Sequence, residues 1–181
     1  MKLNDKNLIW IDMEMTGLNP EKDYILEIAT VVTDYKLSIL SEGPSIVIHQ
    51  SDYKLSMMNK WNINTHTKSG LINEIRCSKI NEKKAMYKTI NFLSKWVPYG
   101  ISPICGNSIY NDRKFLFKYM RLLENYFNYR CIDVSSLKEL VIRWKPEILN
   151  KFKKNNKHRS IYDIYDSIYE LSIYRKYFIN L

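Results

Sequence analysis

The sequence is poor in the residues that build linkers, repeats and disulfide frameworks. Its 181 residues include five glycines, five prolines and three cysteines. So little glycine and proline excludes a collagen-like, linker-rich or low-complexity chain. Cys77, Cys105 and Cys131 are odd in number and form no CxxC pair. This argues against a disulfide framework or a zinc site and is typical of a protein in the reducing cytoplasm. The three histidines also lack the clustered spacing of a zinc site.

Long hydrophobic runs are missing as well. No stretch reaches the roughly 20 apolar residues that a membrane-spanning helix needs. Residues 1–7 lack the basic start, apolar stretch and cleavage site of a secretion signal. Hydrophobic residues nevertheless make up 45% of the chain, which is enough to bury a sizeable core. We therefore expect a single cytoplasmic domain over residues 1–181, with no membrane partner.

Negative charge is scarce relative to positive charge. The 19 Asp and Glu residues oppose 28 Lys and Arg residues, for a formal net charge of +9. A basic domain favours a polyanionic partner such as nucleic acid. A second interpretation is codon bias, because Lys, Asn, Ile and Tyr share AT-rich codons and are abundant together here. The composition does not decide between the two.

Hydrophobic periodicity predicts an α/β fold. Three apolar runs in close succession indicate an antiparallel meander, and the second half alternates short strands with helices, as parallel βα units do. We expect a mixed sheet of antiparallel and parallel strands, flanked by helices on both faces. The expected strands are 8–15, 25–32, 39–49, 102–106 and 131–134, the expected helices are 55–77 (broken near 61–65), 82–97, 111–127, 135–144 and one with apolar positions from 161 to 175, and 151–157 is an expected polar loop.

Two acids interrupt the first apolar strand. Asp12 and Glu14 are two residues apart, so in a strand their side chains project from the same face. Burying two neighbouring carboxylates is costly unless cations compensate them. Hard oxygen ligands of this kind favour Mg²⁺ or Mn²⁺. The alternative is a pair of acids that stays hydrated at the end of the strand.

A third acid and a histidine–acid pair follow later in the chain. Asp112 opens an expected helix, where an acid can simply favour the positive N-terminus. His158 and Asp163 are five residues apart, which on an ideal helix separates them by about 140°. They can point into one site only if His158 lies before the helix or in its first turn, with Asp163 on the helix itself. Taken alone, a histidine in such a Lys-rich loop is ordinarily a solvated surface residue.

The order of these residues is more specific than any one of them. D-x-E on the first strand, a mid-chain Asp at a helix start and a late H-x4-D resemble the DEDDh branch of the DEDD exonuclease superfamily. Over nearly its full length the chain resembles the oligoribonuclease family within that branch. The matching stretches are LIWIDMEMTGLNP, ILEIATVVTD, EGP followed by IHQSD, THTKSGL, WVP, SPICGNSI, DRKFLFKYM and DVSSLKELVIRWKPEIL.

This resemblance implies a ribonuclease H-like fold that hydrolyses RNA from the 3′ end with two divalent cations, Mg²⁺ or Mn²⁺. The implied metal ligands are Asp12, Glu14, Asp112 and Asp163, with Asp12 bridging both ions. His158 is implied to be the general base that takes the proton of the attacking water. A nucleic-acid-binding module on an inactive nuclease fold is expected to lack at least one of these residues, and none is missing.

The resemblance also implies a set of substrate-binding residues. Stacking residues would sandwich the bases, polar residues would cap the 5′ phosphate, and a partner subunit of a homodimer would complete the cap. For Trp61, packing in the core is a second interpretation. The implied stacking residues are Leu18 and Trp61, and the implied cap consists of Ser108, Arg130, Ser135 and Tyr129 of the partner subunit.

A capped channel admits only very short RNA, so the resemblance implies that chiefly dinucleotides are hydrolysed to 5′-mononucleotides. The alternative is another DEDDh nuclease that acts on longer RNA or DNA 3′ ends. His66 is expected to have a structural role. Because a dinucleotide carries few charges, we attribute most of the excess lysine to codon bias.

Overall fold

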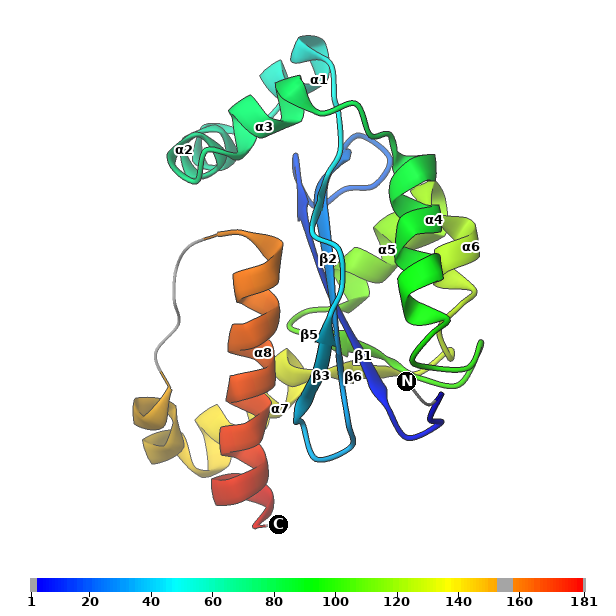
Figure 1. The fold of residues 1–181 in the computed structure, drawn as a ribbon. Coiled ribbons are helices and arrows are strands. Elements are labelled where there is room, and N and C mark those ends of the chain that lie inside the picture. Colours follow the sequence, from blue (N-terminus) through cyan, green and yellow to red (C-terminus); the bar gives the residue numbers. More distant parts are fainter. Residues whose placement is uncertain (1–2, 153–157, 181) are drawn as a thin grey trace.

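A six-stranded mixed sheet lies between two groups of helices (Figure 1). The computed structural model describes residues 3–152 and 158–180. No helix among these residues is long and apolar enough to cross a bilayer. The strands are β1 (Leu8–Met15), β2 (Ile25–Thr33), β3 (Ile39–Glu42), β4 (Ile46–Val47), β5 (Ile104–Gly106) and β6 (Cys131–Asp133). The α-helices are α1 (Asp52–Ser56), α2 (Lys60–Lys68), α3 (Leu71–Cys77), α4 (Glu82–Leu93), α5 (Tyr110–Tyr119), α6 (Arg121–Glu124), α7 (Val134–Trp144) and α8 (Ser160–Tyr174), with a 3-10 helix η1 (Pro146–Lys151) and a π-helix η2 (Arg175–Ile179).

The strand order confirms the expected meander and the parallel pairs. The strands follow one another as β3-β2-β1-β5-β6, with β4 also paired to β2. β1 runs antiparallel to β2 and parallel to β5, which runs parallel to β6. The carboxyl ends of β1, β5 and β6 therefore lie at one edge of the sheet, which is where open α/β sheets ordinarily bind ligands.

Side chains of β1 alternate between two cores. Ile9, Ile11 and Met13 pack with the core of α4, α5 and α6, whereas Trp10 packs with the core of α7 and α8. Figure 1 shows these two groups of helices on the two sides of the sheet. Because side chains alternate along a strand, residues 12 and 14 share the face of Trp10. The acids of β1 consequently point toward α8.

Helices α1, α2 and α3 form an arm, residues 52–77, beyond the carboxyl end of β1 (Figure 1). Two side chains of α2 attach the arm to the chain at the end of β1. The Nδ2 of Asn62 donates a hydrogen bond to the carbonyl oxygen of Thr16 at 2.6 Å, and Nε2 of His66 lies 3.3 Å from the carbonyl oxygen of Met15. The arm is thereby held over the acidic end of the strand.

The predicted break in the arm near 61–65 is wrong. These residues lie inside α2, and the chain turns instead at 57–59 and 69–70. Asn59 caps α2 by accepting a hydrogen bond from the backbone N–H of Asn62 at 2.8 Å. Gly70 takes a left-handed conformation, with φ of 79°, that lets α3 begin in a new direction.

Several other predicted elements are shorter or divided. The strand predicted at 39–49 is two short strands, β3 and β4, because Pro44 between them has no N–H to donate to a sheet. The helix predicted at 111–127 is divided into α5 and α6 at Met120, whose φ of −137° is not helical. The helix predicted at 82–97 ends at Leu93. Lys151 ends η1, while 153–157 of the predicted polar loop lie outside the described residues.

Candidate active site

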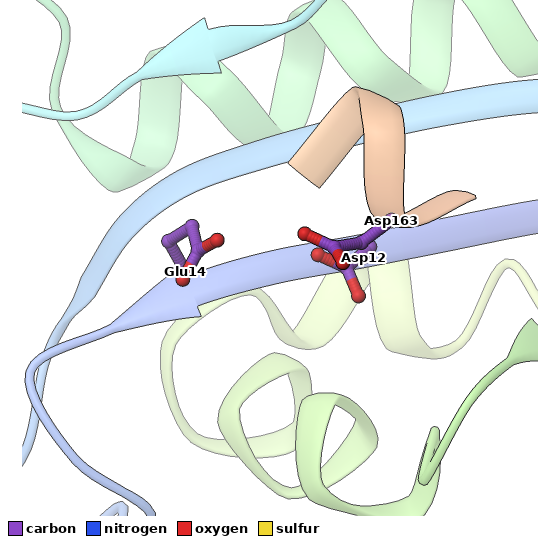
Figure 2. Close-up of side chains that lie close together, drawn as sticks. All are labelled: Asp12, Glu14 and Asp163. Carbon is purple, nitrogen blue, oxygen red and sulfur yellow. The ribbon is translucent and has the colours of Figure 1, made fainter. Parts of the chain in front are cut away.

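Three carboxylates converge where β1 approaches the first turn of α8. Asp12 and Glu14 project from one face of β1, and Asp163 reaches them from α8 (Figure 2). One carboxylate oxygen from each residue lies within 4.8 Å of the others. The alternation of the strand explains the first two, and the packing of α8 against β1 brings the third.

Asp112 is anchored next to this group of three. It lies buried in the first turn of α5, and its Oδ1 accepts a hydrogen bond from the backbone N–H of Met13 at 2.9 Å. Burial raises the pKa of Asp112 to about 8. Its charge in turn raises the pKa of Asp12. The structure thus gathers three of the four predicted ligands and places the fourth beside them.

The charges of this cluster oppose one another. Burial raises the pKa of Asp12 well above its ordinary value, and the charges of Asp112, Asp163 and Glu14 raise it further. Burial also raises the pKa of Glu14 to about 7, again with a contribution from Asp163. Carboxylate oxygens at this spacing are the ligands that hard divalent cations prefer. The residues present therefore fit a divalent cation, which would relieve the repulsion.

His158 lies two residues before the start of α8, outside the helix, as a common site with Asp163 requires. Ser160 is the first residue of α8, so Asp163 falls in the first turn. The backbone of His158 is left-handed, with φ of 46°, which is uncommon for a residue other than glycine. Its imidazole meets the ring of Trp61 edge-on, with 5.9 Å between ring centroids. His158 lines a cavity of about 290 Å³ together with Asp12, Met13, Glu14, Asn107, Ser108, Ser135, Lys138, Asp163 and Ser167.

Ser108 and Ser135 contribute two neighbouring hydroxyl groups to this cavity. Their Oγ atoms are 3.0 Å apart. The backbone N–H of Ser108 donates to Oγ of Ser135 and to Oδ1 of Asp133, both at 2.9 Å. Asp133 also caps α7 by accepting from the N–H of Ser135. The end of β5 and the start of α7 are thereby tied together, and both hydroxyls lie near the positive end of a helix.

Sequence reasoning missed Asn107, Lys138 and Ser167, which line the same cavity. Lys138 lies one helical turn after Ser135 on α7. This spacing indicates that the two side chains share one face of the helix, so Lys138 could have been predicted from Ser135. Its Nζ lies 3.3 Å from Oε1 of Glu170, whose side chain has no exposed surface. The burial of Glu170 carried less sequence signal, because its partners Asn107 and Lys138 come from other elements and Tyr174 alone of the three donors lies on the same helix.

A second cavity, of about 560 Å³, contains both predicted stacking residues. Leu18 and Trp61 line it together with Glu14 and His66. Leu18 is 66% exposed and Trp61 is 63% exposed, so the core-packing interpretation of Trp61 is wrong. His66 is buried and its Nδ1 lies 3.9 Å from Oε2 of Glu14. Burial lowers the pKa of His66, and its contact with Met15 fits the expected structural role.

Tyr129 and Arg130 stand apart from the two serines. Both are exposed and precede β6, whereas Ser135 follows it. The guanidinium of Arg130 lies over the ring of Tyr129, 4.4 Å from its centroid. Within the described part of the chain, neither residue is among those that line the cavity of Ser108. The structure therefore brings together two of the predicted cap residues and leaves the other two facing solvent.

Comparisons with known proteins show the family to which the chain belongs. Residues 9–171 match a family model described as Exonuclease. The chain is 62% identical to an oligoribonuclease of Wigglesworthia glossinidia brevipalpis over 179 residues, which cover 99% of this chain and 96% of the relative. It is 59% identical to an oligoribonuclease of Sodalis glossinidius and 57% identical to one of Escherichia coli K12, each over the full length of both chains.

Solved structures of exonuclease I share the fold. Escherichia coli exonuclease I in complex with a dA16 oligonucleotide superposes with a TM-score of 0.74 at 15% identity, over 94% of this chain and 41% of that one. The zinc-bound form of its complex with single-stranded DNA gives a TM-score of 0.73, over 94% and 40%. At this identity the likeness concerns the fold alone, and it confirms the expected ribonuclease H-like mixed sheet.

Proposed function

The chain belongs to the exonuclease family, and from this premise we propose that it is a 3′-to-5′ exoribonuclease that hydrolyses very short oligoribonucleotides, chiefly dinucleotides, to 5′-mononucleotides. The full-length identity to oligoribonucleases supports this activity. The observation that carries it is the convergence of Asp12, Glu14 and Asp163 in one cavity with His158. Two cores that share one sheet support a single exonuclease domain over residues 1–181.

Asp12, Glu14, Asp112 and Asp163 are the residues that would hold two divalent cations, Mg²⁺ or Mn²⁺. When bound, such cations supply Lewis-acid chemistry and neutralise the developing charge of the phosphodiester. The raised pKa values of Asp12, Glu14 and Asp112 support this assignment. The protein leaves these carboxylates poorly compensated, so a cation gains more by binding there than at an exposed acid.

His158 is the proposed general base. Its exposed imidazole lies at the rim of the cavity that contains Asp12 and Asp163. From this position it can take a proton from water inside the cavity and release it to solvent. The edge-on contact with Trp61 limits the orientations of the ring.

The proposed substrate contacts divide between bases and phosphate. Leu18 and Trp61 both present apolar surface to the cavity that contains Glu14, and stacking of bases on such surface contributes roughly 1–3 kcal/mol per base. Ser108 and Ser135 offer hydroxyls beside the N-terminus of α7, a favourable environment for the 5′ phosphate.

Arg130, together with Tyr129 of the partner subunit in a homodimer, is proposed to complete the phosphate cap. The 72% exposure of Tyr129 and its stacking with Arg130 offer a ring and a cation to a second molecule. Sedimentation equilibrium of the wild-type protein tests the dimer, and a monomer at all concentrations would contradict it. The three free cysteines support a cytoplasmic location.

The decisive experiment is hydrolysis of a length series of 5′-labelled RNAs by the purified protein. Mg²⁺ and Mn²⁺ are compared, with a chelator as the control. We expect dinucleotides to be cleaved much faster than long oligomers and the chelator to abolish turnover. Equal rates on dinucleotides and long RNA, or a preference for DNA, would instead identify a nuclease of the same fold that acts on longer 3′ ends.

A further inference from the structure

An arginine next to His158 joins three elements of the fold. The guanidinium of Arg159 contacts Glu27 through Nε, at 3.1 and 3.2 Å from Oε1 and Oε2, and through Nη2 at 2.8 Å from Oε1. It contacts Glu74 through Nη1 and Nη2, each at 2.8 Å from one carboxylate oxygen. Glu27 lies fully buried on β2, and Glu74 lies on α3 of the arm. One side chain thus fastens the sheet, the arm and the segment that leads into α8.

Glu27 is a fixed anchor for this arginine. Its Oε2 also accepts a hydrogen bond from the backbone N–H of Ser160, the first residue of α8, and its Oε1 accepts one from the hydroxyl of Ser45, both at 3.1 Å. Glu27 stands directly opposite Glu14 in the β1–β2 ladder. Glu27 is therefore paired across the sheet with a member of the acidic cluster. An acid inside an otherwise apolar strand was a sequence signal for such a site.

His158 has a backbone conformation that its surroundings must maintain. A left-handed conformation in a residue other than glycine persists only where neighbouring contacts fix it, and the φ of His158 is 46°. Two contacts do so here. Arg159 follows it in the chain and is held by two carboxylates, and Trp61 lies against its ring. Trp61 and Glu74 both belong to the arm.

We propose that Arg159 is a positioning residue, whose contacts with Glu27 and Glu74 hold His158 at the rim of the catalytic cavity and couple it to the arm that carries Trp61. This role deepens the proposed function and rests on it. The arm then positions two groups at once: the nucleobase of the substrate, which stacks on Trp61, and the imidazole of His158, which takes the proton. Movement of the arm moves both together.

Single substitutions with a matched control test this role. Glu74→Gln removes the tie to the arm but leaves Glu27 paired, and Arg159→Gln removes both ties. Arg76→Gln is the control, because Arg76 lies on the same helix and forms an exposed ion pair with Asp52 at 2.8 Å. With a dinucleotide and Mg²⁺, we expect Glu74→Gln and Arg159→Gln to lower kcat by about 10- to 100-fold, as a displacement of about 1 Å does. KM should change by less than about twofold, and Arg76→Gln should match the wild type.

Arg159→Lys separates geometry from charge. Lysine keeps the positive charge but lacks the planar fork that holds two carboxylates at once. We expect its kcat to stay close to that of Arg159→Gln. Full recovery in Arg159→Lys, or a kcat for Glu74→Gln equal to that of Arg76→Gln, would overturn the positioning role.

A second measurement requires no catalysis. The chain has three histidines, so their imidazole NMR signals are resolvable. Glu74→Gln and Arg159→Gln should shift or broaden the signals of His158. His49, whose Nδ1 lies 3.1 Å from the carbonyl oxygen of Ile75 on α3, reports whether that helix itself is intact and should not change. Unchanged His158 signals would refute the positioning role of Arg159, whatever the activity of the protein. Failure of the wild type to cleave dinucleotides would count against the proposed function alone.

Discussion

Helix α8 borders two carboxylate sites with opposite surroundings. Near its middle, Glu170 is met by donors: the Tyr174 hydroxyl at 2.6 Å, Nδ2 of Asn107 at 3.0 Å and Nζ of Lys138 at 3.3 Å. At its first turn, the charges nearest to Asp12 belong to other acids, which raise its pKa. Burial alone therefore does not identify a functional carboxylate. A buried acid surrounded by donors supports the fold, whereas a buried acid among other acids must be neutralised by a cation or a proton.

The sharpest test of this contrast is Asp12→Asn. The change removes one charge from the acidic cluster with almost no change in size. We expect kcat to fall by about 10⁴-fold, since about 5 kcal/mol of charge stabilisation in the transition state is lost. Stability toward urea should not decrease, because the repulsion in the cluster is relieved. Retention of metal-dependent turnover in this variant would contradict the ligand assignment.

His158→Ala tests the histidine that lines the same cavity as Asp12 and Asp163. Loss of a general base should lower kcat on the order of 10³-fold with little change in KM for a dinucleotide. Thermal unfolding serves as the control, since an exposed side chain contributes little to stability. A rise in KM at unchanged kcat would instead assign His158 to substrate binding.

Glu170→Gln is the converse of Asp12→Asn. It leaves the ammonium of Lys138 without its buried partner and places an amide group among donors. We expect a loss of about 2 kcal/mol in unfolding free energy, less than for a fully buried ion pair because Lys138 is partly exposed. Urea denaturation measures it, and kcat should fall far less than in Asp12→Asn. Equal stability losses in the two variants would remove the distinction between the sites.

A further prediction concerns the pH dependence of the stability of the metal-free protein. In the folded chain Glu14 and Asp112 keep their protons to about pH 7 and about pH 8, whereas ordinary carboxyl groups lose theirs near 4.5 and 3.8. Between these limits the folded state binds more protons than the unfolded one, so its stability falls as pH rises.

Added Mg²⁺ should offset this loss. We expect it to raise the thermal midpoint by a few degrees at about pH 8 and to have little effect at about pH 5, where protons occupy the acids. Differential scanning calorimetry measures the shift, with Ca²⁺ and a monovalent salt of equal ionic strength as controls. The same shift at both pH values would contradict the site.

Sequence patterns predicted the parts of the site that depend on short-range order. β1 has the predicted bounds Leu8–Met15. A long apolar run favours a buried strand, and the two acids in it are two residues apart, so both point from the same face. The position of His158 before α8 also followed from geometry, since a common site with Asp163 excluded a continuous helix through both.

What the sequence did not predict depends on contacts between distant segments. The turns of the arm are set by single capping residues such as Asn59, and the hydrophobic pattern does not report these. Burial of Glu170 depends on Asn107 and Lys138, which come from the end of β5 and from α7. The separation of Arg130 from the two serines arises because Arg130 precedes β6, whereas Ser135 follows β6 and Ser108 follows the neighbouring strand β5.

Asp163 lies late in the sequence, on a helix that must pack across β1 before it meets Asp12. The cluster of Asp12, Glu14 and Asp163 is consequently incomplete in any partly made chain that lacks this helix. The emerging polypeptide lacks the complete cluster until the segment with Asp163 has left the ribosome and α8 has docked, so the order of synthesis delays assembly of the candidate site until the fold is formed.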